Sequence, residues 1–378
     1  MTNDSTLLNV AIIGGGPAGC AAALTLLNQT SLKVGILEST NYSDFRIGES
    51  VSPSFLALLK YLKIDNEFSS DIQIPSNGID TSWGSPNLQS RDFFFTGQGN
   101  GWNLDRRNFD KMLADKVKKR NGVIFNSVKF VKQEKEKSMW NLLVNKEDGS
   151  SMQINADFVI DASGKNASFA RSLGCKWNVL DYLVGIASVY EIVDTDEEQP
   201  YTLLESTPDG WWYSTLIPGN RRIVVFMTDS DIAKKLERQK PENWENALKK
   251  TLHIKKTIKN AKLIRNPTLF PAYSQIIQNT NNLQWIPAGD AAASFDPLSS
   301  IGIGHAIVSG IESARIAFNT IQSDGALGDR YIEKVYGNFQ QYLKNRKYFY
   351  EIEKRWKDKP FWKRRQSKIE MNLFQKSF

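Results

Sequence analysis

The sequence predicts an α/β protein in which a helix-covered parallel sheet is interrupted by an antiparallel sheet and followed by C-terminal helices. Three observations carry this prediction: a strand, glycine turn and helix begin near residue 9, strand-like runs fill residues 182–228, and a long helical pattern begins near residue 329. At 378 residues the chain exceeds the size at which one hydrophobic core stops growing, so we expect more than one unit.

The composition is that of a globular protein. It contains no apolar run of roughly 18 residues and no charged-then-apolar leader, so we expect a cytoplasmic protein without an integral membrane segment. Cys20 and Cys175 give neither a disulfide framework nor a metal-ligand spacing, and the only histidines are His253 and His305. A zinc or non-haem iron site is therefore not expected.

The net charge of +7 is concentrated near the C-terminus. Eleven Lys and Arg stand against three acidic residues between Lys344 and Lys368, so this stretch carries 11 − 3 = +8 and the remainder 7 − 8 = −1. One interpretation is a docking surface for an acidic partner or a membrane, with Trp356, Phe361 and Trp362 as anchors. The other is a solvated helix whose aromatic side chains pack back on the body. Nucleic acid is not an expected partner.

The first motif is a strand, a glycine-rich turn and a helix. Residues 9–13 form a largely apolar run, Gly14-Gly15-Gly16-Pro17-Ala18-Gly19 follow, and residues 20–27 favour a helix. Gly14 permits the tight turn, Gly16 lets the backbone approach a pyrophosphate, and Gly19 allows close helix–strand packing. A second strand, residues 33–37, ends in Glu38, whose carboxylate can accept from ribose hydroxyls. These features predict a Rossmann-like dinucleotide site formed by Gly14, Gly16, Pro17, Ala18, Gly19 and Glu38.

A second motif distinguishes the dinucleotides. Residues 284–287 read as a short strand that runs into Ala288-Gly289-Asp290. This resembles the "GD" motif of FAD-binding flavoprotein hydroxylases, in which the Asp holds a ribityl hydroxyl; the alternative is that Asp290 is a plain N-cap. By the same resemblance, residues 296–304 open a helix beside the isoalloxazine and place Pro297, Gly302 and Ile303 at the cofactor. A helix N-terminus there stabilises reduced flavin.

Two further segments fit the same superfamily. Arg46-Ile47-Gly48-Glu49-Ser50 resembles the R-x-GES segment of flavin-dependent halogenases and geranylgeranyl-reductase-like flavoproteins, which implies that Arg46 and Ser50 lie near FAD. The segment from Asp105 to Asp110 resembles a helix start that puts an arginine, here Arg106, beside the FAD. The alternative is an Asp105 N-cap with a solvated Arg106.

The resemblance implies a Rossmann-like FAD-binding domain with an inserted antiparallel β-sheet substrate domain and C-terminal helices. Strand-like runs at residues 185–192, 201–206, 211–217 and 222–227, separated by turn residues, predict the antiparallel sheet. In this superfamily such a sheet roofs the substrate pocket. The expected boundaries are 1–80, 101–180 and 276–325 for the FAD-binding domain, 81–100 and 181–275 for the substrate domain, and 326–378 for the C-terminal helix and basic tail.

The resemblance also bears on the reaction. Halogenases of this superfamily use a lysine downstream of the GES segment to carry the oxidised halide, whereas residues 64–110 contain none. Both tryptophans of their W-x-W-x-I-P marker are replaced in residues 213–218. Residues 82–85, 101–106, 209–213, 353–356 and 361–365 instead resemble LodB-like flavoproteins, which oxygenate a tryptophan of a partner enzyme to build its quinone cofactor.

The implied activity is that of an FAD-dependent monooxygenase hydroxylating an electron-rich aromatic ring through a C4a-hydroperoxyflavin. The ring belongs either to a small molecule or to a tryptophan side chain of a partner protein during tryptophylquinone cofactor formation. Alternatives are a flavin-dependent halogenase, a geranylgeranyl-reductase-like oxidoreductase on a small molecule, and a non-catalytic flavin-binding assembly factor. Because only one glycine fingerprint occurs, we expect electrons from an external electron donor or a flavin reductase.

Aromatic and titratable residues supply the remaining candidates. The substrate-pocket candidates are Trp83, Phe93, Phe94, Phe95, Trp211, Trp212 and Tyr213, each of which could equally be ordinary core. The catalytic candidates are Glu49, whose pKa partial burial would raise, and His305, which could also be a satisfied helix residue.

Overall fold

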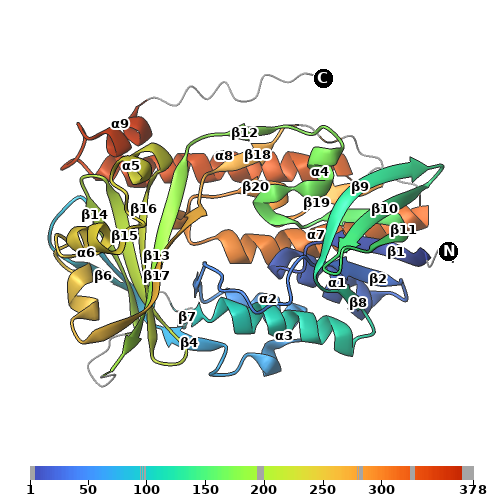
Figure 1. The fold of residues 1–378 in the computed structure, drawn as a ribbon, viewed down its shortest axis with the longest axis horizontal. Helices are drawn as coiled ribbons and strands as arrows, with labels where there is room; N and C mark the ends of the chain where they lie inside the picture. The colour runs from blue at the N-terminus through green and yellow to red at the C-terminus, as the bar shows by residue number, and fades with distance from the viewer. Residues whose placement is uncertain are drawn as a thin grey trace.

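Two large sheets stand at opposite ends of the molecule in a computed structural model, which describes residues 5–367 except 94, 96, 98, 194–199, 279, 281–283 and 324–327. In Figure 1 the antiparallel sheet lies at the left and the largely parallel sheet at the right, with helices α7 (Gly302–Ser323) and α8 (Gly328–Ile352) running between them. No helix in the described part of the chain is long and apolar enough to cross a bilayer.

The first sheet begins with the predicted strand, turn and helix. Its order is β8-β2-β1-β11-β10-β9, with β19 also paired to β11. The strands are β1 (Ser5–Ile13), β2 (Val34–Leu37), β8 (Val123–Phe125), β9 (Val128–Glu136), β10 (Met139–Lys146), β11 (Ser151–Asp161) and β19 (Trp285–Pro287). Strands β8, β2, β1, β11 and β19 run parallel. Val10 and Ile12 pack into one core cluster and Ala11 and Ile13 into another, because both faces of this sheet are covered.

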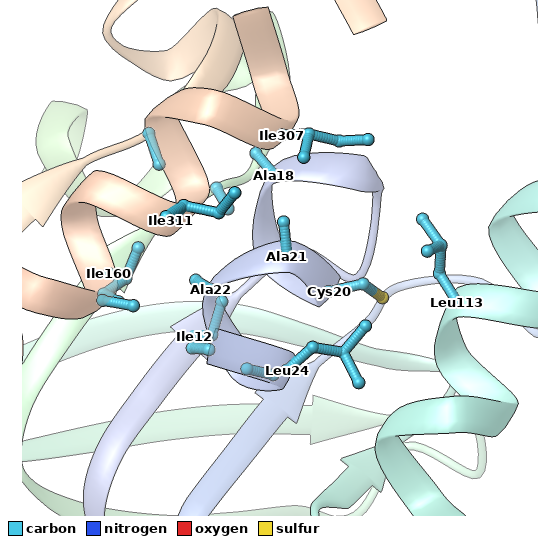
Figure 2. Close-up of a cluster of buried hydrophobic side chains, with 14 of the residues drawn as sticks. Ile12, Ala18, Cys20, Ala21, Ala22, Leu24, Leu113, Ile160, Ile307 and Ile311 are labelled. Atoms are coloured by element: carbon cyan, nitrogen blue, oxygen red, sulfur yellow. The ribbon is translucent and has the colours of Figure 1, made fainter. Parts of the chain in front are cut away.

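Helices α1 (Pro17–Gln29), α2 (Phe55–Tyr61), α3 (Arg106–Lys119) and α7 share the core on one face of this sheet. Figure 2 shows small side chains of α1, including Ala18 and Cys20, among Ile307 and Ile311 of α7 and Leu113 of α3. A Cβ on Gly310 would lie 2.2 Å from the carbonyl oxygen of Ala18, so a glycine there lets α7 approach α1 closely.

The predicted antiparallel sheet has the order β17-β13-β16-β15-β14-β5-β6, in which only the β14–β5 pair is parallel. Its strands are β5 (Gly78–Ser82), β6 (Gln89–Asp92), β13 (Leu183–Ile192), β14 (Tyr201–Thr207), β15 (Gly210–Ile217), β16 (Arg221–Asp229) and β17 (Ala261–Pro271). Helices α5 (Ser230–Lys235) and α6 (Pro241–Leu248) and the 3-10 helix η4 (Ile254–Ile258) cover one face. The domain boundaries given above stay predictions.

Short elements join the two large sheets. One small sheet contains β3 (Ser50–Val51), β7 (Gly101–Leu104) and β4 (Gln73–Ser76), and another contains β12 (Trp177–Val179), β18 (Gln275–Ile277) and β20 (Ala293–Ser294). The other short helices are η1 (Asp65–Glu67), η3 (Gly164–Asn166), α4 (Ser168–Ser172), η5 (Gly289–Ala291) and η6 (Pro297–Ser299). Helix α8 ends at Ile352, and Pro360 begins a separate helix α9 (Pro360–Gln366).

The basic C-terminal segment buries its aromatic residues. Phe361 and Trp362 are both 0% exposed, and Trp362 Nε1 donates to the carbonyl oxygen of Thr207 at 2.8 Å. Arg365 is also buried and pairs with Asp229 at 2.6 Å. The docking interpretation with these rings as anchors is therefore wrong. The alternative, in which the aromatic residues pack on the body, is correct because buried rings remove a large apolar area from water.

Candidate functional site

A cavity of about 690 Å³ is lined by residues of both large sheets and of α7. The predicted cofactor residues that line it are Gly14, Gly16, Pro17, Ala18, Glu38, Arg46, Ser50, Arg106, Asp290, Pro297, Gly302 and Ile303. Gly19 is not among the lining residues. A Cβ on Gly19 would lie 1.9 Å from the carbonyl oxygen of Gly14, so this glycine serves the close packing of α1 on the turn.

The glycine turn leaves open space at one position only. Gly14 has φ +101°, and a Cβ there would lie 2.3 Å from the carbonyl oxygen of Ala162. At Gly16 the nearest atom to an added Cβ is Arg46 Nη1, at 3.9 Å. Because α1 begins at Pro17, its first backbone N–H groups point toward this open space. The turn can therefore receive a pyrophosphate.

Ionic contacts hold the walls beside the turn. Glu38 Oε2 accepts from the backbone N–H of Gly15 at 2.7 Å, and Arg46 Nη2 lies 3.3 Å from Glu38 Oε1. Arg46 and Arg106 both pair with the buried carboxylate of Asp110, at 3.0 and 3.2 Å. Asp110 was missed by the sequence analysis, although its spacing four residues after Arg106 was a usable signal.

Helix α3 combines an N-cap at Asp105 with a cavity-lining side chain at Arg106. Asp105 caps α3 by accepting from the backbone N–H of Asn108 at 3.0 Å. Arg106 is nevertheless not solvated: its Nη1 donates to the carbonyl oxygen of Ile47 at 2.8 Å, and the residue lines the cavity.

Asp290 lines the cavity close to the glycine turn, because a Cβ on the preceding Gly289 would lie 3.0 Å from the Cβ of Ala18. It lies within η5, whose N-cap is Ala288, so Asp290 is not a plain N-cap. Its carboxylate pairs with Lys165 Nζ at 3.3 Å. Lys165 also lines the cavity and was missed by the sequence analysis, although it directly follows the turn that ends β11.

Helix α7 opens toward the same volume. Asp296 accepts from the backbone N–H of Leu298 at 3.0 Å and so caps the η6 turn before α7. A Cβ added to Gly302 or Gly304 would meet nothing within 4 Å. The two cradles that the glycines leave, at Gly16 and at the α7 N-terminus, fit the pyrophosphate and the ring of a flavin dinucleotide, and Asp290 stands beside them.

The antiparallel sheet closes the cavity from the other side. Its contribution, hereafter the roof, consists of Thr202, Leu204, Trp211, Tyr213, Met227, Phe270 and Pro271. Trp212 points to the other face and packs on Trp244 with ring centroids 4.9 Å apart, because successive residues of a strand alternate.

Three other aromatic candidates do not line the cavity. Trp83 contacts Trp211 edge-on with centroids 6.2 Å apart, and Phe95 is 85% exposed. Phe93 follows β6 and lies near Gly101, whose added Cβ would be 2.8 Å from the Phe93 ring. Phe94 lies outside the described residues.

Glu49 and Tyr213 meet inside the cavity. The phenol of Tyr213 donates to Glu49 Oε2 at 3.0 Å, and the backbone N–H of Gly48 donates to Oε1 at 2.8 Å. Burial raises the pKa of Glu49 to about 7. Burial, followed by the neighbouring Glu49, raises the pKa of Tyr213 well above its ordinary value. Glu49 can therefore exchange a proton near neutral pH, while Tyr213 stays a donor.

His305, the other catalytic candidate, does not line the cavity. Its ring lies edge-on to Phe295 with centroids 4.6 Å apart. Burial lowers the pKa of His305, which favours the neutral imidazole.

Comparisons with known proteins agree with this arrangement. Residues 9–98 and 87–377 match the family model described as tryptophan halogenase. The chain is 33% identical over 357 residues to the FAD-dependent oxidoreductase LodB of Marinomonas mediterranea, covering 94% of this chain and 95% of that protein.

Solved structures confirm the fold class. The flavin-dependent halogenase CmlS matches with a TM-score of 0.86 and 23% identity, over 97% of this chain and 69% of that chain. The peptidyl tryptophan dihydroxylase QhpG, essential for tryptophylquinone cofactor biogenesis, matches with a TM-score of 0.73 and 19% identity, over 97% of this chain and 80% of that chain. At these identities the likeness concerns the fold alone.

Proposed function

The chain belongs to the tryptophan halogenase family and is an FAD-dependent oxidoreductase, and on this premise we propose that it is a monooxygenase of electron-rich aromatic rings. We further propose that the ring is a tryptophan side chain of a partner protein. The observation that carries the proposal is the chemistry of the roof, which is aromatic and apolar and contains no lysine.

Residues on both sides of the cavity would hold the cofactor. Gly16 and the start of α1 would bind the pyrophosphate, Glu38 the adenosine ribose, and Asp290 the ribityl chain. Gly302 and Ile303 would lie against the isoalloxazine. Bound FAD, once reduced by an external donor or a flavin reductase, supplies activation of O₂. One oxygen atom would join the ring and the other would leave as water.

The positions of the cavity lysines support oxygenation over halogenation. Lys129 follows Val128, whose backbone N–H donates to the carbonyl oxygen of Glu38, so Lys129 lies at the glycine-turn end. Lys165 pairs with Asp290. Neither lies on the roof, where a lysine would have to stand to carry an oxidised halide to a substrate ring.

The roof also favours a substrate whose aromatic ring is not close to a carboxylate group of the same molecule. The polar groups of the roof are the hydroxyls of Thr202 and Tyr213, and the carboxylate of Glu49 lies beside them. The nearby Arg106 guanidinium already pairs with Asp110 and donates to two backbone carbonyl oxygens. The α-carboxylate of a free amino acid would therefore meet no cation on the roof itself and would lose hydration with little compensation. A tryptophan within a polypeptide carries no such carboxylate, which supports the protein substrate.

Glu49 is our candidate for the base. Replacing a ring hydrogen by a hydroxyl group releases a proton, and the Glu49 carboxylate faces the cavity with a pKa near 7. Tyr213 and the backbone of Gly48 hold the carboxylate in place. The proton would pass to Glu49, while the aromatic roof excludes water from the reacting atoms.

A mass-spectrometric experiment tests the proposal. The FAD-loaded protein is reduced and mixed with O₂, chloride or bromide, and either a tryptophan-containing peptide or free indole. We expect a product heavier by one or two oxygen atoms and no halogenated peptide. Halogenated peptide or halogenated free indole above a no-enzyme control would overturn the proposal in favour of a halogenase.

A further inference from the structure

A basic strip stands apart from the C-terminal tail. Residues 249–265 contain seven basic and no acidic residues, so the strip carries 7 − 0 = +7, equal to the net charge of the whole chain. Its cations are Lys249, Lys250, Lys255, Lys256, Lys259, Lys262 and Arg265, and all are exposed. They lie on one continuous segment that runs from the end of helix α6 through the η4 turn into the first half of β17.

Buried contacts hold the strip in a fixed conformation. The carboxylate of Glu205, 2% exposed on β14, accepts from three successive backbone N–H groups, those of Leu252, His253 and Ile254, at 2.5 to 2.9 Å. The hydroxyl of Thr257 lies 2.9 Å from that of Ser214 on β15. Because the backbone of the strip is already ordered, binding a ligand would not cost the conformational entropy of ordering it.

The strip leads to the cavity. Strand β17 is the edge of the antiparallel sheet, and its last residues, Phe270 and Pro271, line the cavity. At about 3.3 Å per residue, the strand carries the chain on the order of 26 Å from Lys262 to Phe270. Midway, the guanidinium of Arg265 lies 4.4 Å from the centroid of the Phe45 ring, in the loop that continues to Arg46 at the cavity wall.

The residue composition of the strip favours an acidic polypeptide over nucleic acid or a membrane as its anionic ligand. Residues 249–265 contain no Phe, Tyr or Trp on which a base could stack, and the one imidazole ring, that of His253, is held by a contact of its Nε2 with the carbonyl oxygen of Pro86 at 2.8 Å, which disfavours single-stranded nucleic acid. The longest helical element among the strip's own residues, η4, has five residues, too short to lie in a membrane interface. Leu252 and Ile264, 49% and 48% exposed, add apolar contacts of the kind a polypeptide can fill.

Strand addition is not the binding mode. Pro267 lacks an N–H, and the pairing of β17 with β13 shifts register on either side of Val189. Proline and bulges of this kind hinder another strand from pairing with the edge of a sheet. Recognition would therefore rest on side-chain charges.

We propose that this strip docks an acidic segment of the partner polypeptide and thereby brings its reactive aromatic side chain to the cavity. The delivery of the ring rests on the proposed function, whereas the docking does not. The attraction is electrostatic, so it should weaken as salt shortens the screening length to about 8 Å near 0.15 M.

Binding is measured without turnover. The probe is a fluorescein-labelled peptide of Glu, Asp, Gly and Ser with one tryptophan, and the readout is anisotropy at low and at physiological salt. The variant Lys256→Glu/Lys259→Glu/Lys262→Glu should raise the dissociation constant at least tenfold, about 1.4 kcal/mol. The matched control Lys118→Glu/Lys119→Glu/Lys146→Glu changes the total charge equally at exposed sites elsewhere and should stay within about twofold of wild type. FAD content and melting temperature report on folding.

Two other outcomes of the binding experiment would overturn the docking proposal. Equal loss in both triple variants would mean that only net charge matters. Tighter binding of a single-stranded DNA of equal charge, or of anionic phospholipid vesicles, with the same sensitivity to the strip variant would assign the surface to that ligand. Turnover is then compared: the strip variant should raise KM for the acidic peptide and leave that for free indole unchanged. Absence of oxygenation in wild type, with binding intact, would refute the proposed function alone.

Discussion

The phenol of Tyr350 donates a hydrogen bond of 2.7 Å to the carboxylate of Asp296, joining helix α8 to the loop that opens α7. Arg346 Nε lies 3.3 Å from the same carboxylate, and the backbone N–H of Asp296 donates to the phenol oxygen of Tyr342. Tyr350 in turn accepts from Trp211 Nε1 at 3.1 Å. One face of α8 thus holds both the loop expected at the flavin and the roof.

Tyr350→Phe should therefore weaken FAD binding. Removing a hydrogen bond to a buried carboxylate costs roughly 1.5 to 3 kcal/mol, so we expect the FAD dissociation constant to rise about tenfold or more. Titration of apoprotein with FAD, followed by flavin fluorescence and the visible spectrum, gives the measurement. Tyr348→Phe, at a 63% exposed neighbour, is the control and should leave both unchanged. Unaltered affinity and spectrum in Tyr350→Phe would rule out this role of α8.

Gly16→Val should abolish flavin binding without unfolding the chain. Gly16 has φ −73°, which L-residues adopt freely, and the space above it is open. Valine methyl groups would fill the place expected for the pyrophosphate. Flavin content after purification, released by acid because no covalent attachment is expected, is the readout. Gly337→Ala, also facing open space but on α8, is the control. Normal flavin content in Gly16→Val would remove the pyrophosphate from this turn.

Glu49 should impose a pH dependence on turnover. With a pKa of about 7, the carboxylate becomes available as a base as pH rises through neutrality, so the rate should fall about tenfold per pH unit well below pH 7. The Glu49→Gln variant should turn over slowly, and its rate should lack this decrease at low pH, the acid limb of the pH profile. Tyr213→Phe removes a hydrogen bond that lowers the pKa of Glu49, so the limb should move to higher pH. An acid limb that persists in Glu49→Gln would exclude Glu49 as the base.

The same group should affect stability in the opposite sense. The pKa of Glu49 rises from 4.5 to about 7 on folding, so its contribution to stability is complete below pH 4.5 and is lost as pH passes 7. The melting temperature of wild type should therefore fall relative to that of Glu49→Gln across this window. A constant difference between the two proteins would show that the carboxyl is not held at a raised pKa.

Arg365→Glu should destabilise the fold, whereas Lys363→Glu should not. Arg365 is buried against Asp229, so the substitution would place two carboxylates together, at a cost of about 3 to 5 kcal/mol. Lys363 is exposed on the same helix and serves as the matched control. Thermal melting followed by circular dichroism distinguishes them. Equal melting temperatures would mean that α9 adds no stability to the antiparallel sheet.

Local sequence patterns were sufficient to predict much of the glycine turn and of the antiparallel sheet. The structure has the tight turn expected at Gly14 and open space at Gly16, because such a turn needs a positive φ at one position and room at another, and both requirements restrict residue type directly. Strands β13 to β16 of the antiparallel sheet were predicted to within a few residues because turn residues separate alternating runs, whereas β5, β6 and β17 were not predicted. The cation at Asp290 was not predicted, because Lys165 and Asp290 come from separate crossings of the sheet.

By itself, then, the sequence determined the glycine turn with its flanking strand and helix, four strands of the antiparallel sheet and the kind of cofactor, since φ preference, period and helix starts act over a few neighbouring residues. Only the tertiary structure decided which aromatic side chains face the cavity, that Glu49 meets Tyr213 164 positions away, and that Phe361 and Trp362 are buried. The physical reason is that burial and strand register depend on what packs against an element from elsewhere in the chain. On β15, for example, Trp211 faces the cavity while the next residue, Trp212, faces the opposite side of the sheet.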